Sequence, residues 1–150
     1  EIFDIHDYIL SLKDGFEFNY NQNGAQLTFD LKAKNHLINV DSVHFTNVIL
    51  NLIENGIKYC NHEPIISIKT KNESNQLILS ISDNGIGIEK EHLRNVFEKF
   101  YRVPTGNIHN VKGFGLGLYY VKTIIDAHQG KIDVKSKPGI GSTFSIKLPN

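Results

Sequence analysis

Hydrophobic and polar positions along this chain recur with two different periods. Apolar residues repeat at helical spacing in some segments and alternate with polar residues in others. Helices are predicted over residues 1–20, from about 43 to 60, over about 89–97, and from the GFGLG segment to near His128. Strands are predicted over residues 27–33, 36–40, 65–72, 76–82, 131–137 and 142–148.

The order of these elements predicts an α+β fold. Strands follow one another mainly as hairpins, and the strand–helix–strand alternation of a doubly wound fold is missing. We therefore expect a two-layer α/β sandwich with helices packed on one face of a mixed, mostly antiparallel sheet. Residues 1–150 are predicted to be a single domain, with residues 1–20 as its N-terminal lead-in.

Composition narrows the class of protein further. Hydrophobic residues make up 40% and charged residues 21%, the balance of a globular domain, and the formal net charge is zero. A neutral chain argues against nucleic acid as a partner, and without a long apolar run no direct membrane contact is expected. Cys60 is the only cysteine, so no internal disulfide can form and a reducing compartment is expected. The chain begins at Glu1, so we expect it to be a piece of a longer protein.

The helix that contains NVILNLIENGIKYC carries an unusual polar row. Asn47, Asn51, Asn55 and Tyr59 are spaced four apart, so a helix stacks them on one face beside a wide apolar face. Asparagine is a poor helix former, and solvated helix faces usually carry Glu and Lys instead. The asparagine carbonyl suits Mg²⁺ and Lys58 suits phosphate, so this row is a candidate ligand site, with a solvated stripe as the alternative.

Two glycine-rich segments follow. DNGIGI comes at a strand end, where Gly85 and Gly87 would let a flat ligand approach the backbone while Asp83 accepts a hydrogen bond. GFGLGL precedes a helix whose N-terminus favours phosphate. It lacks the preceding strand of a Rossmann motif, and the chain has no P-loop sequence. Each segment alone is also compatible with an ordinary turn or connection.

In chain order the motifs are Asn-x-x-x-Asn-x-x-Lys-Tyr, Asp-x-Gly-x-Gly, Phe-x-x-Phe-Tyr-Arg, Gly-x-Gly-x-Gly-Leu and Gly-Ser-Thr-Phe. This set resembles the catalytic ATP-binding domain of two-component sensor histidine kinases, in the GHKL superfamily shared with gyrase, heat-shock chaperones and mismatch-repair ATPases. The resemblance runs from about residue 30 to 148. It implies the GHKL fold, and ATP and Mg²⁺ as ligands.

The resemblance also implies roles for individual residues. Asn55 would bind Mg²⁺, and Asn51, Lys58 and Arg102 would complete the catalytic phosphate region, with Lys99 as a further phosphate contact. Asp83 would bind the adenine amino group, with Thr143 assisting through water. The stretch from roughly 98 to 116 would be a mobile ATP lid, anchored by Phe97 and Phe100 unless these are simply core aromatics. The remaining nucleotide-binding positions are Tyr59, Gly85, Gly87, Gly113, Gly115, Leu116 and Gly117.

One position favours phosphoryl transfer over ATP hydrolysis. Hydrolysing members of the superfamily place a glutamate four residues before the magnesium asparagine, as general base for water. Asn51 occupies that slot here, and an amide cannot take a proton. Glu54 is adjacent to Asn55 but is turned away from it on the helical wheel. A histidine acceptor, already nucleophilic near neutral pH, needs less activation than water.

The acceptor itself is missing from the sequence, because none of the seven histidines has the setting of a phosphorylated histidine. The resemblance therefore implies γ-phosphoryl transfer to a histidine on a separate dimerisation domain, with a response regulator as an indirect partner. A non-catalytic nucleotide-binding module and an independent ATPase or serine kinase are the alternatives. The implied location is cytoplasmic, and whether the parent is anchored in a membrane is left open.

Overall fold

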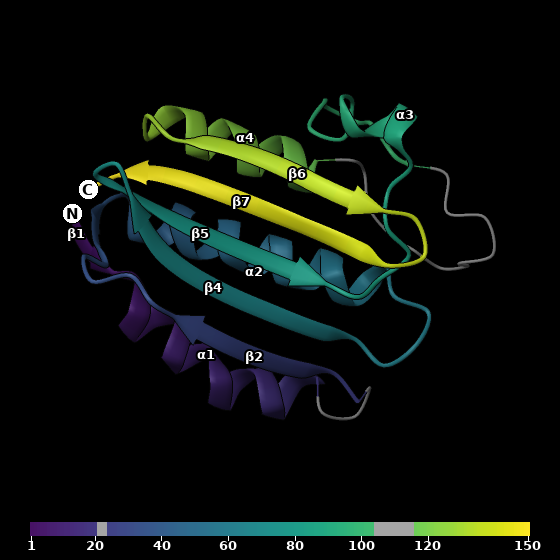
Figure 1. Ribbon diagram of the computed structural model, residues 1–150, viewed down its shortest axis with the longest axis horizontal. Helices are drawn as coiled ribbons and strands as arrows, with labels where there is room; N and C mark the ends of the chain where they lie inside the picture. The colour runs from purple at the N-terminus through teal and green to yellow at the C-terminus, as the bar shows by residue number, and fades with distance from the viewer. Residues whose placement is uncertain (21–23, 104–115) are drawn as a thin grey trace.

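A computed structural model of the chain describes residues 1–20, 24–103 and 116–150, with the backbone alone for residues 17–20. Helices and strands lie close to the predicted segments (Figure 1). In chain order they are β1 (Ile2–Asp4), α1 (Ile5–Tyr20), β2 (Gln26–Leu31), β3 (Leu37–Asn39), α2 (Ser42–Lys58), β4 (Ile65–Glu73), β5 (Gln76–Asp83), α3 (Lys90–Leu93), α4 (Gly117–Ala127), β6 (Lys131–Lys137) and β7 (Gly141–Pro149).

The main sheet has five strands in the order β2-β4-β5-β7-β6. Strands β4 and β5 form one hairpin, β6 and β7 form another, and the two hairpins join along the antiparallel β5–β7 pair. Only β2 runs parallel to its neighbour β4 among the strands of this sheet. The predicted mixed, mostly antiparallel sheet is therefore confirmed.

Helices α1, α2 and α4 lie on one face of the sheet (Figure 1). Side-chain alternation in β4, β5 and β7 directs every second side chain toward these helices, including Ile66, Leu79 and Ile146, each fully buried. On the other face of the sheet, alternate residues of β4 and β6, such as Lys69, Lys71 and Lys135, are exposed. None of the helices within the described ranges is both long and apolar enough to cross a bilayer.

The beginning of the chain differs from the prediction. Residues Ile2–Asp4 are a strand that pairs antiparallel with β3, so the first helix starts at Ile5 rather than at residue 1. Asp4 explains the boundary, because its Oδ1 accepts hydrogen bonds from the backbone N–H groups of His6 and Asp7 and so caps the first turn of α1. The helix predicted over 89–97 is also shorter. It ends at Leu93, and i→i+3 turns follow it.

Two histidines join these N-terminal elements to the main sheet. The rings of His6 and His36 stack with their centroids 4.2 Å apart. His6 Nε2 lies 2.7 Å from Oγ1 of the buried Thr70 on β4, and His36 Nδ1 lies 2.8 Å from Asp4 Oδ1. Burial and the neighbouring His36 lower the pKa of His6 below 6.5, against the opposing charges of Asp4 and Asp7.

This cluster predicts an acid-sensitive fold. Between the lowered pKa of folded His6 and 6.5, the unfolded chain binds more protons than the folded one. The free energy of unfolding should therefore fall as the pH drops through 6.5, and His6→Gln should flatten that slope. Urea unfolding of the original chain and of His6→Gln, between neutral and mildly acidic pH, measures how the free energy of unfolding depends on pH. Parallel pH profiles for the two proteins would contradict the prediction.

Candidate functional site

Helix α2 carries the predicted row of polar side chains on one face and packs against the sheet with another. Asp41 caps its N-terminus by accepting a hydrogen bond from the His44 N–H at 3.0 Å. The apolar face is buried, as predicted, and consists of Phe45, Val48, Ile49, Leu52, Ile53 and Gly56. Asn51 Nδ2 donates to the carbonyl of Asn47 one turn earlier, at 2.9 Å. The Asn51 Oδ1 is thereby turned toward α4, where it would lie 3.0 Å from a Cβ placed on Gly117.

Asp83 ends β5 and faces the same space as the row on α2. Its Oδ1 accepts hydrogen bonds from the backbone N–H groups of Gly85, at 2.9 Å, and Ser142, at 3.2 Å. Burial raises the pKa of the Asp83 carboxyl, and these two hydrogen bonds oppose that rise. Gly56 makes room for it, because a Cβ there would lie 2.9 Å from the Asp83 Cβ. The carboxylate is therefore fixed in direction and partly removed from water.

The DNGIGI segment depends on close backbone approaches. A Cβ on Gly85 would lie 2.6 Å from the carbonyl oxygen of Tyr59, at the end of α2. Gly87 has φ +74°, and a Cβ there would lie 2.2 Å from the carbonyl oxygen of Lys137. These contacts hold the segment between α2 and the β6–β7 turn. The two glycines therefore admit neighbouring protein backbone in the structure, whereas the sequence led us to expect that they admit a flat ligand.

Two glycines distinguish the requirement for a positive φ from the requirement for space beside the backbone. Gly87 and Gly139 have almost the same φ, +74° and +78°, but only Gly87 has atoms close to the missing side chain. We expect Gly139→Ala to cost about 1–2 kcal/mol from backbone strain, and Gly87→Ala to cost about 1–3 kcal/mol more. Thermal and urea unfolding of both variants measures the difference. Equal losses of stability would contradict the close approach at Gly87.

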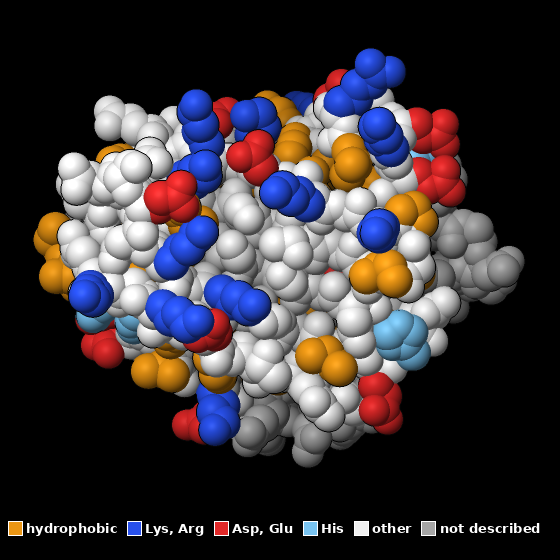
Figure 2. All heavy atoms as spheres, in the orientation of Figure 1, with side chains coloured by type: hydrophobic (Ala, Val, Ile, Leu, Met, Phe, Trp, Pro, Cys, Tyr) orange, Lys and Arg blue, Asp and Glu red, His pale blue; other side chains and the backbone are white. Residues whose placement is uncertain are grey.

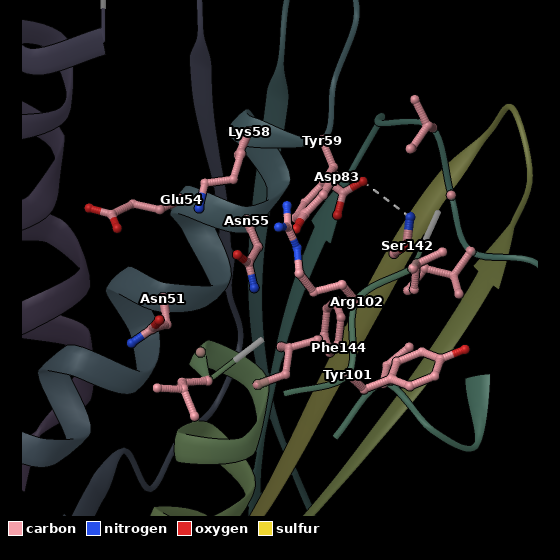
Figure 3. A pocket seen from close by; sticks show the side chains of 18 residues that line it. Asn51, Glu54, Asn55, Lys58, Tyr59, Asp83, Tyr101, Arg102, Ser142 and Phe144 are labelled. Carbon is pink, nitrogen blue, oxygen red and sulfur yellow. Dashed lines mark hydrogen bonds between the residues drawn. The ribbon is translucent and has the colours of Figure 1, made fainter. Parts of the chain in front are cut away.

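Between α2, the DNGIGI segment and the start of α4 lies a cavity of about 260 Å³ (Figure 3). The Asp83 carboxylate and polar side chains of α2 line this space, and in Figure 3 the Arg102 guanidinium reaches into it between Asn55 and Asp83. Much of the remaining lining is apolar. The lining residues are Asn51, Glu54, Asn55, Lys58, Tyr59, Asp83, Ile86, Gly87, Ile88, Val96, Tyr101, Arg102, Val103, Leu116, Gly117, Leu118, Ser142 and Phe144.

Most of the site residues predicted from sequence meet at this cavity. Those that line it are Asn51, Asn55, Lys58, Tyr59, Asp83, Gly87, Arg102, Leu116 and Gly117. Gly85 does not line the cavity, but its backbone N–H donates a hydrogen bond to Asp83, which does. Gly113 and Gly115 lie outside the described residues. Figure 3 shows the Asn55 amide and the Arg102 guanidinium pointing into the same space.

Thr143 does not reach the cavity, and its neighbour Ser142 does. The Thr143 hydroxyl lies 2.8 Å from the Ser82 hydroxyl on the solvent-facing side of the sheet. Ser142 is buried, and its hydroxyl lies 2.7 Å from that of Ser136. The signal was present in the sequence, because Phe144, Ile146 and Leu148 alternate inward along β7 and Ser142 continues that series.

Lys99 also lies elsewhere. Its Nζ stands 5.3 Å from the ring centroid of Phe100 and 5.8 Å from that of Tyr119, in a separate hollow beside α4. Phe97 packs edge-on against Phe144 of the sheet, whereas Phe100 is 63% exposed with φ +64°. Phe97 is therefore the core aromatic of the two. Tyr101, which sequence reasoning overlooked, lines the cavity and hydrogen-bonds to His92 through its hydroxyl.

The residues that line the cavity offer different kinds of chemistry. The fixed Asp83 carboxylate can accept hydrogen bonds from an amino group, while Ile86, Ile88 and Phe144 offer apolar contact to a flat ring. Lys58 and Arg102 offer positive charge, and the N-terminus of α4 also borders the cavity. A cavity that combines apolar walls, one carboxylate and cationic side chains suits a purine nucleotide.

Comparison with known proteins agrees with this chemistry. Residues 40–150 match the family described as histidine kinase-, DNA gyrase B- and HSP90-like ATPase. The sensor protein RprX of Bacteroides fragilis is 46% identical over 148 residues, covering 97% of this chain and 28% of its own length. The sensor protein SrrB of Staphylococcus aureus is 39% identical over 145 residues, covering 94% of this chain and 25% of its own.

Solved structures agree on the fold. The catalytic domain of histidine kinase ThkA superposes with a TM-score of 0.82 at 22% identity, covering 99% of this chain and 94% of that one. The chain belongs to the histidine kinase-, DNA gyrase B- and HSP90-like ATPase family. Within that family, its fold is the one found in the catalytic domains of sensor histidine kinases. It spans about a quarter of the length of the curated sensor proteins it matches.

Proposed function

We propose that this domain binds Mg-ATP in the cavity and transfers the γ-phosphoryl group to a histidine on a dimerisation domain outside the chain. The observation that carries the proposal is the combination of unlike groups in one cavity. It joins a half-buried, directed carboxylate at Asp83 to the side chains of Asn55, Lys58 and Arg102, and apolar residues line the rest. A molecule with a flat, amino-bearing part and an anionic part fits this lining.

At the adenine end, Asp83 would accept a hydrogen bond from the exocyclic amino group. Its Oδ1 already accepts two backbone N–H groups, so the direction of the carboxylate is set before the nucleotide arrives. Ser142, which lines the cavity beside it, takes the supporting role that the sequence suggested for Thr143. The buried Gly85 and the constrained Gly87 keep the backbone close enough to leave a narrow slot.

At the phosphate end, Lys58 and Arg102 would neutralise phosphate charge, and Asn51 would border the phosphates beside the start of α4. The available donors fit Mg²⁺, because Asn55 offers a neutral, hard oxygen and the phosphate oxygens of the nucleotide would be further ligands. Among residues 1–20, 24–103 and 116–150, no three His, Cys, Asp or Glu side chains form a metal site by themselves. Mg²⁺ would supply charge neutralisation at the phosphates.

Transfer to a histidine is favoured over hydrolysis by the side chains on α2. Asn51, in the slot where a hydrolase carries its base, is an amide whose Nδ2 donates to a backbone carbonyl. Glu54 lies at the rim of the cavity, but Figure 3 shows its carboxylate pointing away from Asn55. Without a base for water, catalysis rests on positioning and on charge neutralisation of the phosphoryl group.

The partner of this domain would be the dimerisation domain of the same parent protein. A response regulator would then act downstream. The likeness to ThkA supports such a pairing, because ThkA has been solved in complex with the response regulator protein TrrA, at a TM-score of 0.78, 21% identity, and coverage of 99% of this chain and 41% of that one. The likeness to curated sensor proteins also supports a cytoplasmic position in a larger sensor.

Calorimetric titration with a non-hydrolysable ATP analogue, with and without Mg²⁺, tests binding. We expect saturable binding that Mg²⁺ strengthens, and the absence of binding at millimolar nucleotide would overturn the proposal. Transfer is tested by mixing the chain with the parent's dimerisation domain and γ-labelled ATP. Acid-labile, alkali-stable label on that domain supports phosphohistidine. Normal nucleotide binding without any label would instead favour a non-catalytic nucleotide-binding module.

A further inference from the structure

The solvent-facing side of the main sheet is built differently from the rest of the surface. Its centre is a band of hydroxyl groups that pair across neighbouring strands, with Ser82 opposite both Ser67 and Thr143, and Ser80 opposite Ser145. The hydroxyls of Ser82 and Thr143 lie 2.8 Å apart. This centre is polar, and none of its residues lines the nucleotide-sized cavity or the hollow beside α4.

Lysines surround the hydroxyl band. Side-chain alternation along β4, β6 and β7, and at Lys32 directly after the end of β2, places seven of them on this face, and six are exposed. Ile78, opposite both Lys71 and Lys147, is only 6% exposed between their aliphatic stems. Figure 2 views this face and shows blue side chains gathered around a mostly white centre. We call this set the lysine face: Lys32, Lys69, Lys71, Lys131, Lys135, Lys137 and Lys147.

The lysine face carries a net positive charge in a neutral protein. The same strand positions hold three acidic residues, Asp30, Glu73 and Asp133, against the seven lysines, which leaves an excess of four positive charges. Two of the lysines are in ion pairs, Lys32 with Asp30 and Lys71 with Glu73, each at 3.3 Å. Because the whole chain has 16 basic and 16 acidic residues, the remaining surface is negative by the same amount.

We propose that the lysine face binds the surface of an anionic phospholipid bilayer. Lysines on flexible stems that are spread over several strands of one face can meet phosphate head groups at many points without a fixed geometry. Protein interfaces favour aromatic residues and arginine and contain few lysines and serines, the reverse of what lies here. Nucleic-acid surfaces add arginine for base edges or aromatic rings for stacking, and this face has neither.

The proposed contact leaves the nucleotide cavity open. Thr143 and Ser82 face outward, whereas Asp83 and Ser142 face inward toward α2, so the two functions use opposite sides of the same strands. A domain lying on a bilayer by its sheet would direct its helices and its cavity toward the aqueous side. The proposal departs from the expectation of no membrane contact that was drawn from the lack of a long apolar run. A bilayer surface can also be bound through charge, and the fold concentrates on one face charges that cancel over the whole chain.

Vesicle co-sedimentation at low ionic strength tests the proposal. The probes are vesicles of phosphatidylcholine alone and vesicles in which phosphatidylglycerol replaces part of it. The test variant combines Lys69→Gln, Lys135→Gln and Lys147→Gln, which keep the stems and remove three charges. The control variant combines Lys13→Gln, Lys90→Gln and Lys122→Gln, which remove the same charge outside the lysine face. Nucleotide titration and thermal unfolding establish that each variant is folded.

We expect binding to the phosphatidylglycerol vesicles alone, weakened by added salt and by about tenfold or more in the test variant. The control variant should bind nearly as well as the original chain. No binding to anionic vesicles, or equal losses in the two variants, would overturn the proposal. Tighter, salt-sensitive retention on duplex DNA or on polyglutamate than on the vesicles would overturn the choice of a bilayer. Nucleotide binding unchanged in the test variant separates this result from the proposed kinase function.

Discussion

Asn55→Ala is expected to remove the Mg²⁺-dependent part of nucleotide affinity while the domain stays folded. Asn55 is half-buried at the cavity, and its amide points into the space that the phosphates would occupy. Losing one oxygen ligand to a charged group costs about 1.5–3 kcal/mol, or about ten- to a hundredfold in affinity. Calorimetric titration of an ATP analogue, with Mg²⁺ and with EDTA, measures the change.

Asn47→Ala is the matched control for this experiment. Asn47 belongs to the same row on α2, two turns earlier, but it is exposed and does not line the cavity. We expect it to leave nucleotide affinity unchanged in both conditions. If Asn55→Ala bound Mg²⁺ and nucleotide as well as the original chain, the assignment of Asn55 as the metal ligand would be wrong.

Asp83→Asn is expected to reduce ATP affinity by about ten- to a hundredfold without lowering the stability of the nucleotide-free domain. The amide keeps an oxygen for the Gly85 and Ser142 N–H groups, but it replaces the other carboxylate oxygen with a donor that opposes the adenine amino group. Burial raises the pKa of Asp83, so the charged form costs folding free energy at pH values above the folded-state pKa. Removing the charge should therefore leave the melting temperature equal or higher near neutral pH.

Titration with ATP and GTP analogues, paired with thermal unfolding, separates the two effects. A simultaneous fall in melting temperature and affinity would show that Asp83 has a structural role instead. The pH dependence of the original chain offers a second check. Since the pKa of Asp83 is raised, nucleotide affinity should weaken on acidification at a higher pH than for an ordinary carboxyl group of pKa 3.8, and Asp83→Asn should lack that transition.

The sequence predicted most of this fold because its local signals agree. Asp41 and the apolar face of α2 mark one long helix, and alternation marks β4, β5 and β7. The strand at residues 2–4 was not predicted, since three residues carry too little periodicity and its partner β3 lies 35 positions further on. The parallel pairing of β2 with β4 is equally non-local, and no turn between the two strands records it.

The residues of the site also fall into two groups, those with a local signal in the sequence and those that only the tertiary fold brings together. Asn51, Asn55, Asp83 and Gly87 were predicted because each sits in a short motif with its own chemistry. The apolar wall formed by Ile86, Val96 and Phe144 was not predicted, because only the tertiary fold distinguishes these residues from other core positions. The placement of Thr143 was wrong by one residue, which in a strand means the opposite face.

The pairing of β5 with β7 has a consequence for how the domain acquires its function. The β4–β5 and β6–β7 hairpins are local, whereas the register that sets Ser82 opposite Thr143 must close a loop containing α3 and α4. Local contacts form sooner than distant ones. We therefore expect the two hairpins to fold early and to dock late, and only docking brings the Ser142 N–H to Asp83. Nucleotide binding would therefore require that folding is complete. ATP would slow unfolding by stabilising the β5–β7 pairing that joins the two hairpins.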